Sequence, residues 1–339
     1  MVKEEIRILK GIVHILDVNV GMAVLSDAVL DIGPDLQEFL QEHIYKIVSG
    51  DDSKKCEFYR KESRVFANLQ EYDDSKFVDF SKFLAEGLYD IMHANVDIPS
   101  ADLFVVRFME GGKNYIAILK MNYKEFYTHR TQPVESGNVN EVIKHRSILP
   151  ALGSKLTEAA VISLEDFSVT LLERKYEING EKENYFSYLF LKCSSEMPQK
   201  TKLSIVTKAI DAVQKANLEP VEQYSECMKA KAIIDETLKE EGSFTVETIA
   251  EKVFAEHPVL KDEFEEKMEK YNMVREEVAP TCEATVKKYE KQSLTTDTGI
   301  ELKIPMDQYK DPDSVEFITN TDGTVSILIK NIEHIEAKY

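Results

Sequence analysis

Apolar and polar residues alternate at the N-terminus of the chain, and the spacing then becomes helical. Alternation over residues 6–17 and 21–31 predicts two strands, with turn residues at 18–21 between them, and therefore an N-terminal hairpin. After Pro34 and again over residues 77–91, apolar side chains recur every three or four positions, which predicts two helices. We expect these two helices to cover one face of a sheet.

More strand-like runs follow, and two pairs of them are separated by turn residues. The predicted strands are residues 103–109, 115–123, 157–164, 170–178 and 185–191. Gly111-Gly112 joins the first pair and Asn179-Gly180 joins the last pair, because glycine accepts the positive φ angles that tight hairpin turns require. This arrangement predicts an α+β fold: a mixed, mainly antiparallel sheet with packed helices.

Helical spacing dominates after Pro198. One predicted helix extends to Leu218, a second covers residues 221–240, and a third begins at Ser243 or Thr245, since either residue suits a helix cap. The predicted strands of the tail are residues 299–304, 315–319 and 324–330, with a turn at 320–323. The sequence thus predicts an N-terminal sheet-and-helix domain at 1–195, an acidic helical segment at 196–290 and a small β-rich C-terminal unit at 291–339.

The chain is strongly acidic, and the charge is unevenly distributed. Its 339 residues contain 42 Lys and Arg against 61 Asp and Glu, a net charge of −19. Residues 219–290 contain 19 acidic and 10 basic residues, so a net −9 lies in about a fifth of the chain. No apolar run approaches the roughly 18–20 residues that span a bilayer, and the N-terminus does not resemble a signal peptide. We therefore expect a soluble cytoplasmic protein without membrane contact.

Sequence motifs for catalysis and cofactor binding are missing. The phosphate-binding loops GxxxxGKS/T and GxGxxG, the nucleophile elbow GxSxG and the zinc motif HExxH do not occur. The four cysteines are too far apart to form a CxxC pair. The sequence therefore predicts no cofactor, no metal and no catalytic residue, and any metal site would have to be assembled by the fold.

One pair of residues allows a metal-dependent nuclease as an alternative. Such enzymes place carboxylates and a lysine on neighbouring strands, and Asp102 and Lys120 occupy the predicted hairpin in this way. The second carboxylate expected two residues before Lys120 is replaced by Ile118. Asp102 and Lys120 are more simply explained as ordinary surface charges at the ends of strands, and the nuclease is the least favoured hypothesis.

Basic residues form two local clusters on this acidic background. The candidate nucleic-acid contacts are Lys144, His145, Arg146, Lys155, Lys192, Lys200, Lys202, Lys208 and Lys215. Between residues 192 and 215 only two acidic residues oppose five lysines. Lysines at a loop that leads into a helix can contact phosphates, and they can equally neutralise the acidic helices that follow.

Several segments resemble one bacterial protein family. These are residues 12–17, 25–27 and 38–44, the junction Phe190-Leu191-Lys192-Cys193-Ser194-Ser195-Glu196-Met197 with Lys200-Thr201-Lys202, and residues 299–302 and 324–330. Together they resemble the nucleoid-associated protein family, whose members have about this size. The resemblance implies a cytosolic protein found with the chromosome, and it brings no set of catalytic residues.

Two kinds of nucleoid partner are compatible with this resemblance. Proteins that bind DNA usually have a high pI, whereas the pI here is about 4.9. Either a local basic patch contacts the DNA backbone without sequence readout, or the acidic helices bind a basic protein that is itself bound to DNA. Edge strands in the terminal hairpins also allow a homodimer.

Overall fold

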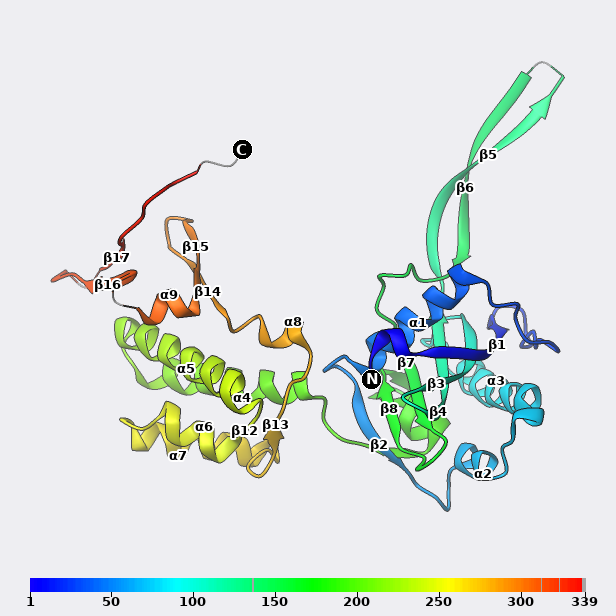
Figure 1. Cartoon of the computed structure of the whole chain (residues 1–339), viewed down its shortest axis with the longest axis horizontal. Coiled ribbons are helices and arrows are strands. Elements are labelled where there is room, and N and C mark those ends of the chain that lie inside the picture. The colour runs from blue at the N-terminus through cyan, green and yellow to red at the C-terminus, as the bar shows by residue number, and fades with distance from the viewer. Residues whose placement is uncertain (136, 312, 323, 337–339) are drawn as a thin grey trace. The chain divides into compact units, whose positions relative to one another are not determined.

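The computed structural model describes residues 1–135, 137–311, 313–322 and 324–336. The chain forms two compact units, Met1–Met197 and Pro198–Tyr339 (Figure 1). The further division near residue 290 stays a prediction.

The first unit combines a sheet, helices and a separate two-stranded ribbon. Its helical segments are η1 (Lys3–Glu5), α1 (Pro34–Val48), α2 (Arg64–Gln70), η2 (Asp74–Lys76), α3 (Phe77–Ala94) and the π-helical η3 (Phe186–Leu191). Its strands are β1 (Arg7–Leu16), β2 (Lys54–Phe58), β3 (Ala101–Glu110), β4 (Lys113–Asn122), β5 (Lys124–Val134), β6 (Gly137–Ile148), β7 (Glu158–Ser163), β8 (Val169–Leu172), β9 (Tyr176–Ile178), β10 (Glu181–Glu183) and β11 (Cys193–Ser195).

The main sheet has seven strands in the order β1-β3-β4-β7-β8-β2-β11, and every neighbouring pair is antiparallel. This confirms the predicted α+β class. The β3–β4 hairpin turns at Gly111 and Gly112, whose φ angles are +56° and +80°, as the glycine pair predicts.

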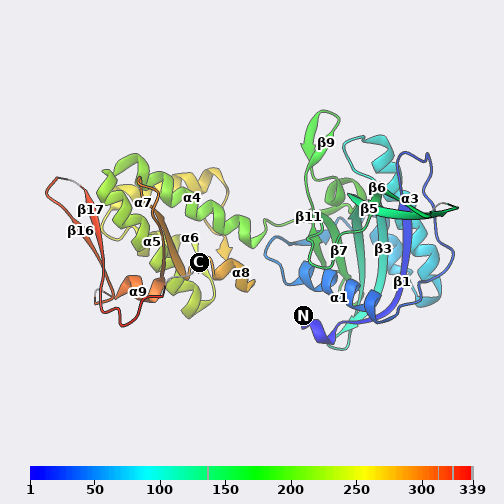
Figure 2. The same cartoon turned by 90° about the horizontal axis from the view of Figure 1, so that it is seen from above.

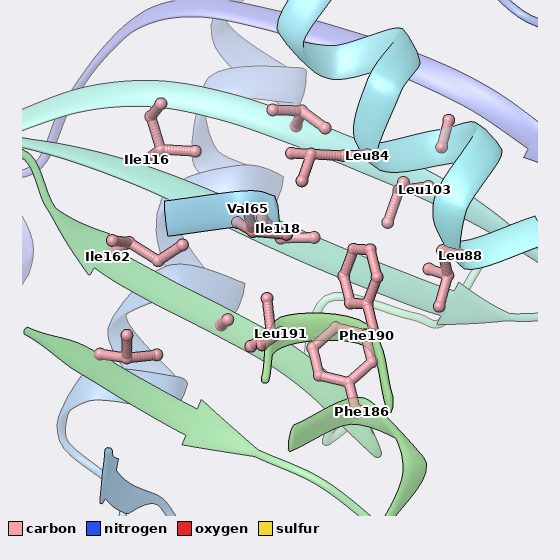
Figure 3. Packing of buried hydrophobic residues seen from close by; sticks show 14 of the residues in the cluster. Val65, Leu84, Leu88, Leu103, Ile116, Ile118, Ile162, Phe186, Phe190 and Leu191 are labelled. Atoms are coloured by element: carbon pink, nitrogen blue, oxygen red, sulfur yellow. The ribbon is translucent and has the colours of Figure 1, made fainter. Parts of the chain in front are cut away.

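The predicted helices α1 and α3 are confirmed, but they cover opposite faces of the sheet. Leu40, Ile44 and Ile47 of α1 pack on the face that carries Phe104 and Leu119, and α1 lies beside β7 (Figure 2) and also contacts β8 and β1. On the other face, Leu84 and Leu88 of α3 belong to one buried cluster with Leu103, Ile116, Ile118 and Ile162 of the sheet (Figure 3). The prediction of one shared face was wrong because β3, β4 and β7 are apolar on both sides, so that each face needs a helix.

The predicted N-terminal hairpin is also wrong. β1 pairs along its length with β3, whereas residues 21–31 contribute only one bridge, between Ile15 and Val24. The buried strand β3 offers an apolar partner for β1, while Val20 and Met22 remain exposed. Local alternation therefore identified a strand but not its partner.

The second predicted hairpin is correct at its turn and wrong in both strands, since residues 170–178 are divided between β8 of the main sheet and the separate strand β9. Asn179 and Gly180 have positive φ angles and join the short strands β9 and β10. Residues 186–191 form the π-helix η3 instead of a strand, because Phe186, Phe190 and Leu191 then face the same core (Figure 3).

The second unit is mainly helical. Its helices are α4 (Gln199–Asn217), α5 (Pro220–Glu241), α6 (Val246–Val253), α7 (Pro258–Lys270), α8 (Glu283–Val286) and α9 (Met306–Lys310). α4 packs on α5 and α7, and α6 packs on α5 and α7. Thr245 is the residue that caps α6, since its Oγ1 accepts a hydrogen bond from the N–H of Thr248 at 3.1 Å.

Short strand pairs complete the second unit. They are β12 (Phe244–Thr245) with β13 (Glu277–Val278), β14 (Lys291–Thr295) with β15 (Glu301–Pro305), and β16 (Val315–Thr319) with β17 (Val325–Ile329). The three predicted tail strands are therefore confirmed as β15, β16 and β17. Position 323 of the predicted turn at 320–323 lies outside the described residues.

Candidate nucleic-acid interface

Three of the candidate residues lie on the ribbon formed by β5 and β6. Among the described residues these two strands pair only with each other, and the ribbon extends away from the rest of the first unit (Figure 1). Lys144 and His145 lie opposite Tyr127 and Phe126 on β5, so their side chains point to opposite faces of the ribbon, and Arg146 follows in the stretch where the register shifts. All three are exposed.

A carboxylate lies beside two of these cations. Glu125 forms an ion pair with Lys144, and its Oε1 is 4.0 Å from Nε of Arg146. The hydrogen bond from Lys144 lowers the pKa of Glu125 below its usual value. The guanidinium of Arg146 remains 76% exposed, so it is accessible to a phosphate while Lys144 is held by Glu125.

The fourth candidate of this cluster, Lys155, follows the ribbon in the sequence. Its ammonium forms an ion pair with Asp52. Lys124, at the start of β5, donates to Oγ of Ser154 at 3.1 Å, so the loop that carries Lys155 lies beside the base of the ribbon.

Lys192 occupies a different part of the first unit. It ends η3 with a φ angle of +52°, and its carbonyl accepts a hydrogen bond from the N–H of Tyr59 at 2.9 Å. Its Nζ lies 4.8 Å from the ring centroid of Tyr188, in a cation–π contact. This residue has a clear local role in fixing the end of η3.

Three lysines of α4 form an exposed stripe in the second unit. Lys200, Lys208 and Lys215 are eight and seven residues apart, which places them on one side of the helix, and all three are exposed. We call this set the lysine stripe. Asp211 lies on the same side and accepts a hydrogen bond from Sγ of Cys227 at 3.2 Å.

Lys202 differs from these three lysines because it is buried. It is 6% exposed, its Nζ is 2.5 Å from Oε2 of Glu276, and it also donates to the carbonyl of Glu277 at 3.4 Å. The ammonium thus holds the segment before β13 against α4. We leave Lys202 out of the nucleic-acid surface for this reason.

The structure does not bring together the pair on which the nuclease hypothesis depends. Asp102 is opposite Met121 on the sheet face that α1 covers, whereas Lys120 is opposite Leu103 on the face that α3 covers. Tyr123 donates to Asp102 at 2.7 Å, and Lys120 is fully buried with its Nζ 3.9 Å from Glu158. Burial lowers the pKa of Lys120 to about 8. Asp102 and Lys120 therefore cannot form one site, and the nuclease hypothesis has no pair of residues to support it.

One group of potential metal ligands exists among the described residues. Glu226, Glu256 and His257 bring their ligand atoms within 4.8 Å of one another. Lys229 lies 2.7 Å from Glu226 and 4.0 Å from Glu256, and its ammonium already compensates the two carboxylates. We therefore assign no metal to this group.

The acidic residues of the second unit include a regular exposed row. Asp262, Glu266 and Glu269 are four and three residues apart on α7 and are all exposed. The predicted acidic segment thus presents carboxylates to solvent and does not bury all of them in ion pairs.

The sequence interpretation missed several ribbon residues. It named Lys144, His145 and Arg146 but predicted no strand there, and it omitted Lys124 and Arg130. The signal was weak because neither face of this ribbon is buried, so the usual contrast between an apolar and a polar face is absent.

An α+β protein that exposes its cations on a free ribbon and on a helix stripe has the features of a protein that binds other macromolecules. A family model described as nucleoid-associated protein YejK matches residues 12–336, which is nearly the whole chain. The chain belongs to this family of nucleoid-associated proteins, and membership implies that it is located at the nucleoid.

A comparison with curated proteins gives no match. Among the described residues, none of the helices combines the length and the apolar character needed to cross a membrane.

Proposed function

We propose that this protein contacts chromosomal DNA directly, through local basic surfaces and without strong sequence preference. Family membership supports the proposal, and the lysine stripe of α4 is the observation that carries it. Lys200, Lys208 and Lys215 present flexible ammonium groups along one side of a helix, which suits contact with backbone phosphates and not with base edges. Arg146 and Lys144 supply a second basic surface in the first unit.

The net charge of −19 restricts how DNA can approach. Beyond about 10 Å in 0.1 M salt, charges are largely screened, so a local group of lysines can attract a phosphate backbone although the whole chain is acidic. The affinity is then expected to be low and to depend steeply on salt. This dependence gives the proposal its test.

Replacing Lys200, Lys208 and Lys215 together by glutamine is expected to weaken DNA binding and to reduce its salt dependence. Each lost phosphate contact lowers the slope of log Kobs against log salt by about 1, so the triple variant should lose about 3. Fluorescence anisotropy with a 30-base-pair duplex across a salt series measures this slope. These three side chains are exposed.

The matched control replaces three exposed lysines of the same unit, Lys270, Lys291 and Lys303, by glutamine. Its change in net charge is the same, so it should keep the slope of the unaltered protein. Equal slopes for both triple variants and the unaltered protein would remove α4 from the contact surface.

A second function is favoured by the exposed carboxylates Asp262, Glu266 and Glu269 of α7. In this alternative the protein is recruited by a basic protein that is bound to DNA, because complementary charges speed association and favour a basic partner. The alternative predicts little binding to naked duplex, together with retention in nucleoid extracts that is lost when these three residues are replaced by their amides.

A further inference from the structure

The β5–β6 ribbon exposes several large apolar side chains to solvent. Tyr127 is 73% exposed, Val142 is 76% exposed and Phe126 is 52% exposed. A two-stranded ribbon that has no further strand or helix against it is only marginally stable in water. Both faces of this ribbon are open along its strands, so it is suited to be covered by a binding partner.

Two of the ribbon's four cations share one face with Tyr127, its most exposed aromatic residue. The register pairs Tyr127 with Lys144, His129 with Val142 and Thr131 with Asn140. Glu125 contacts both Lys144 and Arg146, which places Arg146 beside Lys144 on this side of the ribbon. We call this the tyrosine face. The opposite face carries Phe126, Thr128 and the ion pair between Arg130 and Glu141, whose atoms are 3.4 Å apart.

The charge of the ribbon differs from that of the rest of the chain. Residues 124–148 contain four Lys and Arg and three Glu, a net +1, so the remaining residues carry −20. Two of the four cations, Lys144 and Arg146, lie on the tyrosine face beside an exposed aromatic ring. A second copy of the same basic face would be repelled, whereas the backbone of a nucleic acid would be attracted.

We propose that the ribbon enters the major groove of duplex DNA with its tyrosine face toward the groove floor. This inference rests on the proposed function, DNA contact. A two-stranded ribbon fits the major groove, which is about 12 Å wide, but it is too wide for the minor groove, which is about 6 Å wide. At 3.2–3.4 Å per residue, strands of 11 and 12 residues are roughly 35–40 Å long, about one turn of duplex.

Several residues of the tyrosine face have a distinct place in this arrangement. Arg146 and Lys144, near the base of the ribbon, contact phosphates at the edge of the groove, and Tyr127 and Val142 pack on its apolar thymine methyl groups. Thr131 donates to Asn140 at 2.8 Å, so these two polar groups largely satisfy each other. Few groups remain to read base edges, which agrees with weak sequence preference.

Glu125 opposes binding in this arrangement because it holds Lys144 and lies near Arg146. Its carboxylate would face the phosphates that these cations contact. Glu125→Gln is therefore expected to tighten duplex binding by about 3- to 10-fold at low salt. A carboxylate that only stabilised the ribbon would give the opposite sign.

Neighbouring aromatic residues on opposite faces provide the matched test. In the full-length protein, Tyr127→Ala should weaken binding to a 30-base-pair duplex by about 5- to 10-fold, while Phe126→Ala should change it by less than about 2-fold. Both residues are exposed, so neither substitution opens the core. Glucosylated hydroxymethyl groups on the cytosines fill the major groove, so a duplex that carries them should bind the unaltered protein about as weakly as the plain duplex binds Tyr127→Ala. Netropsin, which occupies the minor groove, should leave the affinity unchanged.

Several results would overturn the inference. Equal losses for Tyr127→Ala and Phe126→Ala would remove the preference for one face, and competition by netropsin would place the contact in the minor groove. If the ribbon variants change the sedimentation of the free protein while duplex affinity stays constant, the ribbon is an interface between copies of this chain. Binding that persists in all ribbon variants leaves the proposed function intact, whereas no duplex binding by the unaltered protein contradicts both.

Discussion

Glu158→Ala is expected to destabilise the sheet of the first unit by about 3–5 kcal/mol, because it leaves the charge of Lys120 buried without a counter-ion. The two side chains are fully buried and lie opposite each other on β4 and β7. Asn122 and Thr157 donate to Glu158 at 3.0 and 2.5 Å, so the substitution also removes the acceptor of two hydrogen bonds. Hydrogen exchange of the β4 and β7 amides in the full-length protein measures the loss without interference from the second unit.

The control removes both charges. Lys120→Met combined with Glu158→Leu replaces the ion pair by apolar side chains of similar size, so it should lose much less stability than Glu158→Ala alone. If the single and the double variant are equally destabilised, the cost comes from packing and hydrogen bonds, and the buried charge of Lys120 contributes little.

Acidification from pH 6.5 to pH 4 is expected to destabilise the first unit through His14 and His43. Burial lowers the pKa of each histidine from 6.5 to about 4, so the folded state resists the protonation that the unfolded state accepts. The contribution of these neutral histidines to the free energy of unfolding is therefore fully present above pH 6.5 and is lost as the pH falls toward 4. At 1.36 kcal/mol per pKa unit, the loss is up to roughly 3 kcal/mol for each residue.

The local contacts explain why both rings are neutral. Nδ1 of His14 accepts a hydrogen bond from the N–H of Ser26 at 3.1 Å, which protonation would break, and Nε2 lies 3.0 Å from Oγ of Ser81. His43 packs edge-on against Phe39, with ring centroids 4.7 Å apart. His43→Leu should remove about half of the pH dependence in a urea titration at several pH values. Stability that stays constant between pH 6.5 and pH 4.5 would show that these histidines are accessible to protons when folded.

The sequence predicted individual helices, strands and turns better than it predicted which strand or core each of them packs against. The helices α1, α3, α4 and α5 and the β3–β4 hairpin have strong periodicity or glycine turns, and local chemistry determines them. The partner of β1 is decided by β3, which is about 90 residues away in the chain and buried on both faces. Likewise, residues 186–191 contain an apolar run that fits a strand or a buried helix, and only the surrounding core selects the π-helix.

At the candidate site, too, the sequence could not predict contacts between residues that are far apart in the chain. Nine basic or histidine residues could be chosen from local clusters, but the sequence did not distinguish the exposed Lys208 and Lys215 from Lys202, which is buried and paired with Glu276. That pairing depends on a segment more than 70 residues later. The ribbon was missed because its two faces are both solvated, so no hydrophobic pattern identifies it, and its long, isolated pairing is visible only in the structure.

The most direct test of DNA contact is the binding of the unaltered full-length protein to two 30-base-pair duplexes of unrelated sequence, measured by anisotropy across a salt series. Direct contact through the lysine stripe and the ribbon predicts equal affinities for both duplexes and a slope of log Kobs against log salt of about −3 to −5. No binding to either duplex at the lowest salt would contradict direct contact and would favour a basic protein partner for the acidic helices.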